Sequence, residues 1–248
     1  AGAFRISRGA KTEAEVVVVE LHDGRHRGWG EAVPYARYGE TVEGVLAEVE
    51  ALREPLEAGL GLDTLQARLG PGAARNAIDC ALWDLKGKAW DQPIYRLLGG
   101  PTRASVPAYA SMLGYSIDPD NAVSVALDFK ARGFSAQKWF FRYGPGDGES
   151  GKARNVALVK ALREALGPFY PLMFDAYMGW DLSYASEMVR AMEPFNLTWL
   201  EEPLAPERVG AFRRLGKASR VPLATGEHVY TRWQVKELLV NDAIDVIQ

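Results

Sequence analysis

The stretch Pro171-Leu-Met-Phe-Asp-Ala-Tyr177 decides the fold, because it is one of three short apolar runs that lead into an acidic residue. The other two runs are Leu197-Thr-Trp-Leu-Glu201 and Val221-Pro-Leu-Ala-Thr-Gly-Glu227. The three acids, Asp175, Glu201 and Glu227, follow one another at equal intervals of 26 residues. One strand, one helix and two connecting loops fill about that length. The interval therefore predicts successive parallel strands, each with an acid at its carboxyl end.

Carboxyl ends of parallel strands meet at one rim of a barrel, and barrel enzymes place their chemistry at that rim. Three carboxylates meeting there would repel one another unless a hard divalent cation lay between them. Ligation by oxygen alone favours Mg2+. We therefore expect Asp175, Glu201 and Glu227 to form a Mg2+ site. The alternative is that each acid only stabilises the amino terminus of the helix that follows it.

The composition is that of an ordinary globular protein, with 48% hydrophobic and 25% charged residues. A net charge of −3 without any block of Lys or Arg predicts no binding to nucleic acid. No apolar stretch reaches the length of a membrane span, and the amino terminus does not resemble a signal peptide. The one cysteine, Cys80, falls in a helical apolar pattern and is predicted to be a small core residue. A cytoplasmic location is expected.

Residues 1–102 are predicted to form an α+β capping domain. Two runs of strand type, Glu13–Leu21 and Gly28–Val33, flank the tight turn Asp23-Gly24 and predict a β-hairpin. Apolar residues at helical spacing follow the hairpin, with Pro55 at the expected end of the first helix. The expected helices are Thr41–Glu54, Gly72–Ala89 and Ile94–Leu98.

Residues 103–248 alternate between strand and helix patterns, which predicts a parallel sheet with right-handed crossovers. The pattern gives about five and a half βα units of a TIM-type barrel, and a closed eight-stranded barrel takes about 250 residues. We expect the complete protein to extend beyond Gln248 and to include a strand before Ala1, because an unfinished barrel exposes two sheet edges. The alternative architecture is an open, doubly wound sheet, although no Gly-rich phosphate loop follows the first strand.

These features together resemble the enolase superfamily, in the mandelate racemase and muconate-lactonizing group. The resemblance rests on the hairpin-and-helix cap, on Asn76-Ala-Ile-Asp-Cys-Ala-Leu-Trp-Asp-Leu-Lys-Gly-Lys88, on Lys138 in the second barrel strand, and on the three acids. It implies that Asp175, Glu201 and Glu227 bind Mg2+, which in turn holds a substrate carboxylate. Loss of an α-proton would then give an enediolate whose charge the cation stabilises.

Within the group, the stretches Gly144–Glu149, Leu172–Ala185 and Thr225–Trp233 look most like acid-sugar dehydratases of the rhamnonate type. The cap stretch Val33-Pro-Tyr-Ala-Arg-Tyr-Gly-Glu-Thr41 is instead similar to dipeptide epimerases. Many relatives carry Lys-x-Lys in the second barrel strand, where the second lysine takes the α-proton. This chain has Phe140 at that position, which counts against racemisation by two opposed bases.

The resemblance implies further site residues. Lys138 is expected to bind the substrate carboxylate, and Arg142, with Tyr143, is a candidate for contacts to sugar hydroxyls or for acid–base chemistry. Tyr177 lies two residues past Asp175, and His228 follows Glu227, so both are candidates for the site. Cap residues expected near the barrel mouth are Arg5, Arg8, Arg37 and Tyr38. For each of these residues, a structural or solvent-exposed role is the alternative.

The sequence thus predicts a Mg2+-dependent lyase, a hydro-lyase that removes water from a sugar acid through a metal-stabilised enediolate. The alternatives are an isomerase of the same superfamily, such as a racemase or dipeptide epimerase, and a truncated barrel without catalysis. The expected partner is a small-molecule carboxylate, and such barrels are expected to assemble as homo-oligomers.

Overall fold

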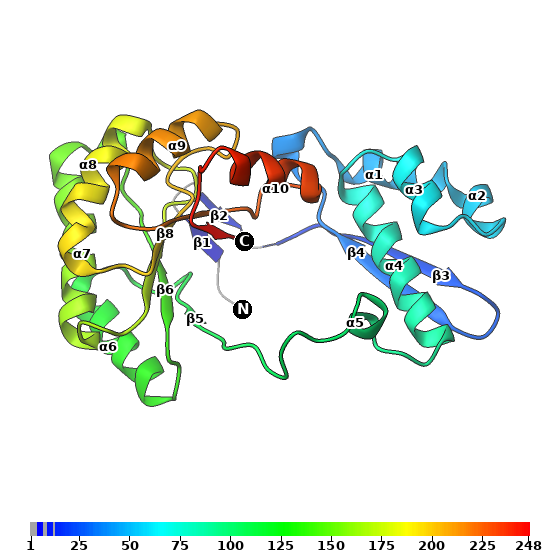
Figure 1. Ribbon diagram of the computed structural model, residues 1–248, viewed down its shortest axis with the longest axis horizontal. Helices are drawn as coiled ribbons and strands as arrows, with labels where there is room; N and C mark the ends of the chain where they lie inside the picture. Colours follow the sequence, from blue (N-terminus) through cyan, green and yellow to red (C-terminus); the bar gives the residue numbers. More distant parts are fainter. Residues whose placement is uncertain (1–3, 7–8, 12) are drawn as a thin grey trace. The chain divides into compact units, whose positions relative to one another are not determined.

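The computed structural model describes residues 4–6, 9–11 and 13–248, with side chains from residue 13 onward (Figure 1). The chain divides into two compact units, one of residues 13–106 and the other of residues 1–12 together with 107–248. The domain boundary predicted after residue 102 stays a prediction. A short antiparallel pair, β1 (Phe4–Ile6) and β2 (Gly9–Lys11), lies in the second unit and was not predicted from the sequence.

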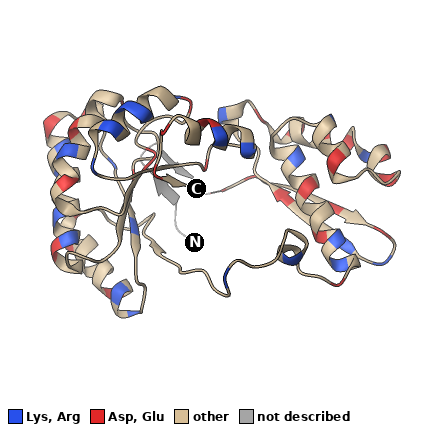
Figure 2. Cartoon of the chain, viewed as in Figure 1, with Lys and Arg blue, Asp and Glu red and all other residues tan. Residues whose placement is uncertain are grey.

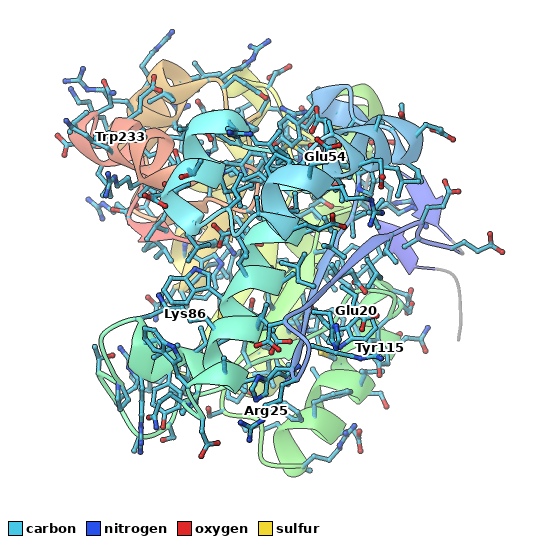
Figure 3. All side chains as sticks on the ribbon, turned by 90° about the vertical axis from the view of Figure 1, so that its right-hand side faces the viewer. Glu20, Arg25, Glu54, Lys86, Tyr115 and Trp233 are labelled. Atoms are coloured by element: carbon cyan, nitrogen blue, oxygen red, sulfur yellow. The ribbon has the colours of Figure 1, made fainter. Side chains whose placement is uncertain are left out.

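The first unit is built on the hairpin of β3 (Val17–His22) and β4 (Arg27–Ala32). Alternate residues of β3 are buried or exposed, and exposed Glu20, labelled in Figure 3, pairs with Arg27 at 2.9 Å. Helix α4 (Ala73–Ala89) covers the buried face. A Cβ on Gly30 would lie 1.9 Å from the Ala77 carbonyl oxygen, so only glycine lets the helix pack this closely.

The helix predicted over Thr41–Glu54 is two helices in the structure, α1 (Val42–Glu50) and α2 (Arg53–Glu57). Thr41 caps α1, since its hydroxyl accepts a hydrogen bond from the Gly44 amide at 3.0 Å. Pro55 lies in the first turn of α2 and does not end the first helix, because a first-turn residue needs no amide hydrogen. The other helical segments of this unit are η1 (Ala36–Tyr38), α3 (Leu62–Arg68) and α5 (Ile94–Leu97).

The predicted core position of Cys80 is wrong, because this cysteine is exposed. The buried stripe of α4 that faces the hairpin includes Ala77, Ile78 and Ala81. Cys80 directly precedes Ala81, and one residue turns an α-helix by about 100°. This rotation takes its thiol off the buried stripe.

The second unit contains a six-stranded sheet in which every neighbouring pair is parallel. The order β10-β9-β8-β7-β6-β5 follows the chain without reversal. A doubly wound sheet reverses its strand order at a switch point, so the sequential order is that of a barrel and confirms the predicted fold class. The strands are β5 (Ala110–Ser111), β6 (Gln137–Phe140), β7 (Leu172–Asp175), β8 (Trp199–Glu201), β9 (Leu223–Thr225) and β10 (Val246–Ile247).

Helices follow the strands in turn, as Figure 1 shows for the second unit. They bury large side chains against the sheet, such as Leu162, Met188 and Phe212, while charges of both signs are interspersed on their outer faces (Figure 2). The helical segments are α6 (Pro119–Ala131), η2 (Pro145–Asp147), α7 (Gly148–Leu166), α8 (Leu182–Met192), η3 (Glu193–Phe195), α9 (Val209–Ala218) and α10 (Thr231–Val240). Among the described residues, no helix is both long and apolar enough to cross a membrane.

Candidate metal and substrate site

Strand register brings two of the three predicted ligands together. Asp175 ends β7 and pairs directly with Glu201, which ends β8, so both side chains lie at the carboxyl edge of the sheet. Glu227 is not in a strand, because β9 ends at Thr225 and Glu227 lies in the turn two residues later. The structure therefore places all three acids at the same rim, on consecutive strands or just beyond them.

Lys138 supplies the positive charge beside these acids. It lies in β6, is buried, and donates a hydrogen bond to Oε1 of Glu201. Its Nζ also lies 3.8 Å from Oδ2 of Asp175. A single ammonium thus contacts two carboxylates from two neighbouring strands. Its predicted role in binding a substrate carboxylate stays a prediction.

Further hydrogen-bond donors orient the carboxylates of Glu201 and Asp175. The indole Nε1 of Trp199 lies 3.1 Å from Oε2 of Glu201, and the amide of Tyr177 donates to Oδ1 of Asp175 at 2.8 Å. The role of Trp199 was not predicted from the sequence. The sequence does contain a signal for this contact, because Trp199 and Glu201 lie two residues apart on one strand and therefore face the same side.

Burial and crowding of negative charge change the protonation of this cluster. Burial raises the pKa of Asp175 to about 7, and the charge of Glu201 adds to the increase more than Lys138 offsets it. Partial burial raises the pKa of Glu227, and the charge of Glu202 adds to this. Burial alone would lower the pKa of Lys138, but the hydrogen bond and charge of Glu201 raise it overall. Burial and mutual repulsion therefore disfavour full ionisation of these acids, and one lysine does not offset this.

A second polar group lies next to Glu227. Glu202 is fully buried, and its Oε1 accepts from the Thr225 hydroxyl at 3.0 Å and lies 2.9 Å from Nδ1 of His228. The same Nδ1 lies 3.6 Å from Oε1 of Glu227. Ligand atoms of Glu202, Glu227 and His228 all lie within 4.8 Å of one another, so this set could hold a cation. Among the described residues, Asp175, Glu201 and Glu227 do not come together as closely in this structure.

The other predicted residues differ in their surroundings. The half-buried ring of Tyr177 lies 5.7 Å from the ring of His228, so both lie near the acids. Arg142 is exposed beyond the end of β6. Tyr143 is directed toward α7, where its hydroxyl accepts from Arg154 at 3.2 Å. In the first unit, Tyr38 packs against Tyr35 at 5.6 Å between ring centroids. Of the three other cap candidates, Arg37 lies half-buried in η1, Arg8 lies outside the described residues, and the side chain of Arg5 is not described.

Comparison with family models agrees with this geometry. The enolase C-terminal domain-like model matches residues 121–248, and the N-terminal domain model of mandelate racemase and muconate lactonizing enzyme matches residues 1–99. The chain belongs to the enolase superfamily. The predicted resemblance to its mandelate racemase and muconate-lactonizing group is thereby confirmed.

Individual members of the superfamily that resemble the chain include a sugar-acid dehydratase and a protein with homology to dipeptide epimerases. An L-rhamnonate dehydratase from Saccharopolyspora erythraea is 36% identical over 177 residues, which cover 71% of this chain. A crystal structure of an enolase family member from Agrobacterium tumefaciens, with homology to dipeptide epimerases and bound to sodium and L-Ala-L-Glu, is 33% identical with a TM-score of 0.78. That match covers 100% of this chain and 70% of the Agrobacterium chain.

A Bradyrhizobium enolase complexed with magnesium and mandelic acid is 26% identical, with a TM-score of 0.81 over 100% of this chain and 69% of that one. The chain spans less than half of the dehydratase, since the aligned region covers 43% of that relative. The comparisons therefore establish the superfamily and the fold.

Proposed function

We propose that this protein is a Mg2+-dependent lyase that removes water from a sugar acid. The observation that carries the proposal is the contact of buried Lys138 with both Glu201 and Asp175, on adjacent strands at the carboxyl rim. The 36% identity to an L-rhamnonate dehydratase supports a sugar acid as the substrate class.

The residues of the rim fit Mg2+. Asp175, Glu201 and Glu227 offer only carboxylate oxygens, which Mg2+ prefers. The raised pKa of Asp175 comes from burial and from the charge of Glu201, and a divalent cation would offset both effects. When bound, the cation would supply Lewis-acid stabilisation of negative charge on the substrate carboxylate.

The protein's own groups would do the remaining work. Lys138 is buried and carries a raised pKa, so its ammonium stays charged and can donate a hydrogen bond to a substrate carboxylate. Neutralising the carboxylate makes the neighbouring α-proton more acidic, so that a general base can take it. The electron pair left on the α-carbon then forms the double bond as the β-hydroxyl, protonated by a general acid, leaves as water. Tyr177 and His228 lie close enough to the acids to contact the substrate or act as the general acid.

Epimerisation is the second candidate function. It is supported by the 33% identity to the Agrobacterium protein with homology to dipeptide epimerases. The residue paired with Asp175 on β6 argues against it, because that residue is Phe140, which is buried and cannot accept a proton. Dehydration needs one principal base, whereas epimerisation exchanges a proton between two faces of the substrate.

The test is a screen of the purified protein with Mg2+ against sugar acids and against dipeptides. Formation of a 2-keto-3-deoxy acid from a sugar acid supports the proposal, and inversion of a dipeptide without sugar-acid turnover would replace it. Glu201→Gln should abolish turnover and weaken Mg2+ binding as measured by calorimetry. Its circular dichroism spectrum should match that of the wild type, which would show that the fold is retained. Lys138→Met should stop exchange of the substrate α-proton with D2O, and exchange at the wild-type rate would remove Lys138 from the site.

A further inference from the structure

Glu202 makes contacts that a residue needed only to end a strand does not require. It directly follows β8 and has a φ of 40°, in the left-handed region that residues other than glycine rarely adopt. On a continuing strand its side chain would point away from the face of Glu201. The left-handed turn instead directs the carboxylate toward the end of β9, where it meets Thr225 and His228.

The backbone of Glu202 connects the carboxyl ends of β7, β8 and β9. Its amide donates to the Ala224 carbonyl of β9 at 2.9 Å, and its own carbonyl accepts from the Met178 amide in the turn after β7. Met178, like Glu202, has a positive φ, of 58°. Glu202 therefore contacts the turn behind Asp175, follows Glu201 in sequence, and holds the turn that carries Glu227.

The side-chain contacts fix the turn of Glu227 most directly. Thr225 is the last residue of β9 and His228 directly follows Glu227, so Glu202 binds the chain on both sides of this acid. Glu227 has a 42% exposed side chain, and its turn would be less constrained without these two contacts. Hydrogen-bonded partners behind metal ligands orient those ligands, and their loss typically weakens metal binding about 10–100-fold.

We infer that Glu202 is a positioning residue, which holds the turn of Glu227 through Thr225 and His228 and so sets the geometry of the predicted Mg2+ site. This inference rests on the proposed function, because it assumes that Glu227 is a ligand. It differs from an assignment of Glu202 as a ligand. Oε1 of its carboxylate binds the Thr225 hydroxyl and the His228 imidazole, and an amide in its place would keep both contacts while removing the charge that a ligand supplies.

The inference is tested by calorimetric Mg2+ titration of three variants, with the Mn2+ electron paramagnetic resonance spectrum as a second readout. Glu202→Ala should raise the Mg2+ dissociation constant about 10–100-fold. Glu202→Gln keeps an oxygen that accepts from Thr225 and from a protonated Nδ1 of His228, and it should bind Mg2+ within about threefold of wild type. Thr225→Val is a milder change that retains the Glu202–His228 contact, so its loss of Mg2+ affinity should lie between those of the two Glu202 variants. It replaces Glu202→Ala as the test if that variant does not fold.

Arg163→Met is the matched control, because Arg163 is also a buried charged residue but binds loops at the opposite ends of the strands. It should reduce stability and leave Mg2+ affinity within about twofold of wild type when measured well below its unfolding temperature. An equal loss of affinity in this control would show that general destabilisation is responsible and would overturn the inference.

The remaining outcomes separate the inference from the proposed function. Wild-type affinity in Glu202→Ala would overturn the positioning role alone. A loss in Glu202→Gln as large as in Glu202→Ala would show that the negative charge acts directly on the cation, which also overturns it. Failure of the wild-type protein to bind Mg2+ would overturn the proposed metal site itself, and the inference with it.

Discussion

Replacing Arg163 with Met should lower the free energy of unfolding by about 3 kcal/mol. The guanidinium lies on α7 and is buried, with 7% of the residue exposed. It donates to four backbone carbonyls and to no carboxylate in the described part of the chain. The acceptors, at 2.6–2.9 Å, are the carbonyl oxygens of Gly167, Tyr170, Phe195 and Asn196.

The magnitude follows from what these bonds replace. A hydrogen bond to a charged group contributes about 1.5–3 kcal/mol, so four bonds set a gross value near 6–12 kcal/mol. Burying the guanidinium has a desolvation cost, which also lowers its pKa, and the freed loops can turn some carbonyls to water. Met keeps the apolar part of the side chain packed. A net loss of about 3 kcal/mol remains, equivalent to a melting temperature lower by roughly 6–12 °C for a chain of this size.

The assay is urea unfolding followed by circular dichroism, with Arg190→Met on the exposed face of α8 as control. The control should change stability by less than about 0.5 kcal/mol. Arg163→Lys should lie between Met and wild type, because one ammonium cannot reach all four carbonyls. A loss below about 1 kcal/mol in Arg163→Met would refute the reasoning, since the four bonds would then contribute no more than one ordinary hydrogen bond.

Three other changes test separate parts of the structure. With a chelator present, Asp175→Asn should be more stable than wild type, by an amount that grows between about pH 4 and pH 7 to about 4 kcal/mol. The reason is that the pKa of Asp175 is raised in the folded state, so its ionisation destabilises the wild-type protein. A difference between the two urea midpoints that stays constant across this pH range would contradict the prediction. Gly30→Ala should destabilise residues 13–106 by about 3 kcal/mol, since its Cβ would meet the Ala77 carbonyl, and hydrogen exchange should show faster opening of α4 and β4. Glu40→Ala should cost about 1 kcal/mol in thermal unfolding because Oε1 of Glu40 caps α4 through the Ala73 amide at 2.6 Å, whereas an unchanged melting temperature would show that water replaces this cap.

The first cap helix and Cys80 show the limit of local patterns. Sequence periodicity predicted helix over Thr41–Glu54, but a first-turn proline is compatible with a new helix, so the chain forms two. Periodicity also identified α4 correctly, yet the face that becomes buried depends on where the hairpin lies. The position of Cys80 therefore follows from packing.

The sequence by itself determined the alternation of strands and helices, the two-part organisation and the positions of Asp175, Glu201 and Glu227 at or just beyond strand ends. These properties follow from hydrophobic periodicity and from spacing along the chain, which are local. Only the tertiary structure decided that Lys138 contacts two acids from other strands, that Glu202 turns toward β9, and that Arg163 joins two loops. These contacts join residues brought together by strand register and backbone turns, and no local pattern in the sequence specifies them.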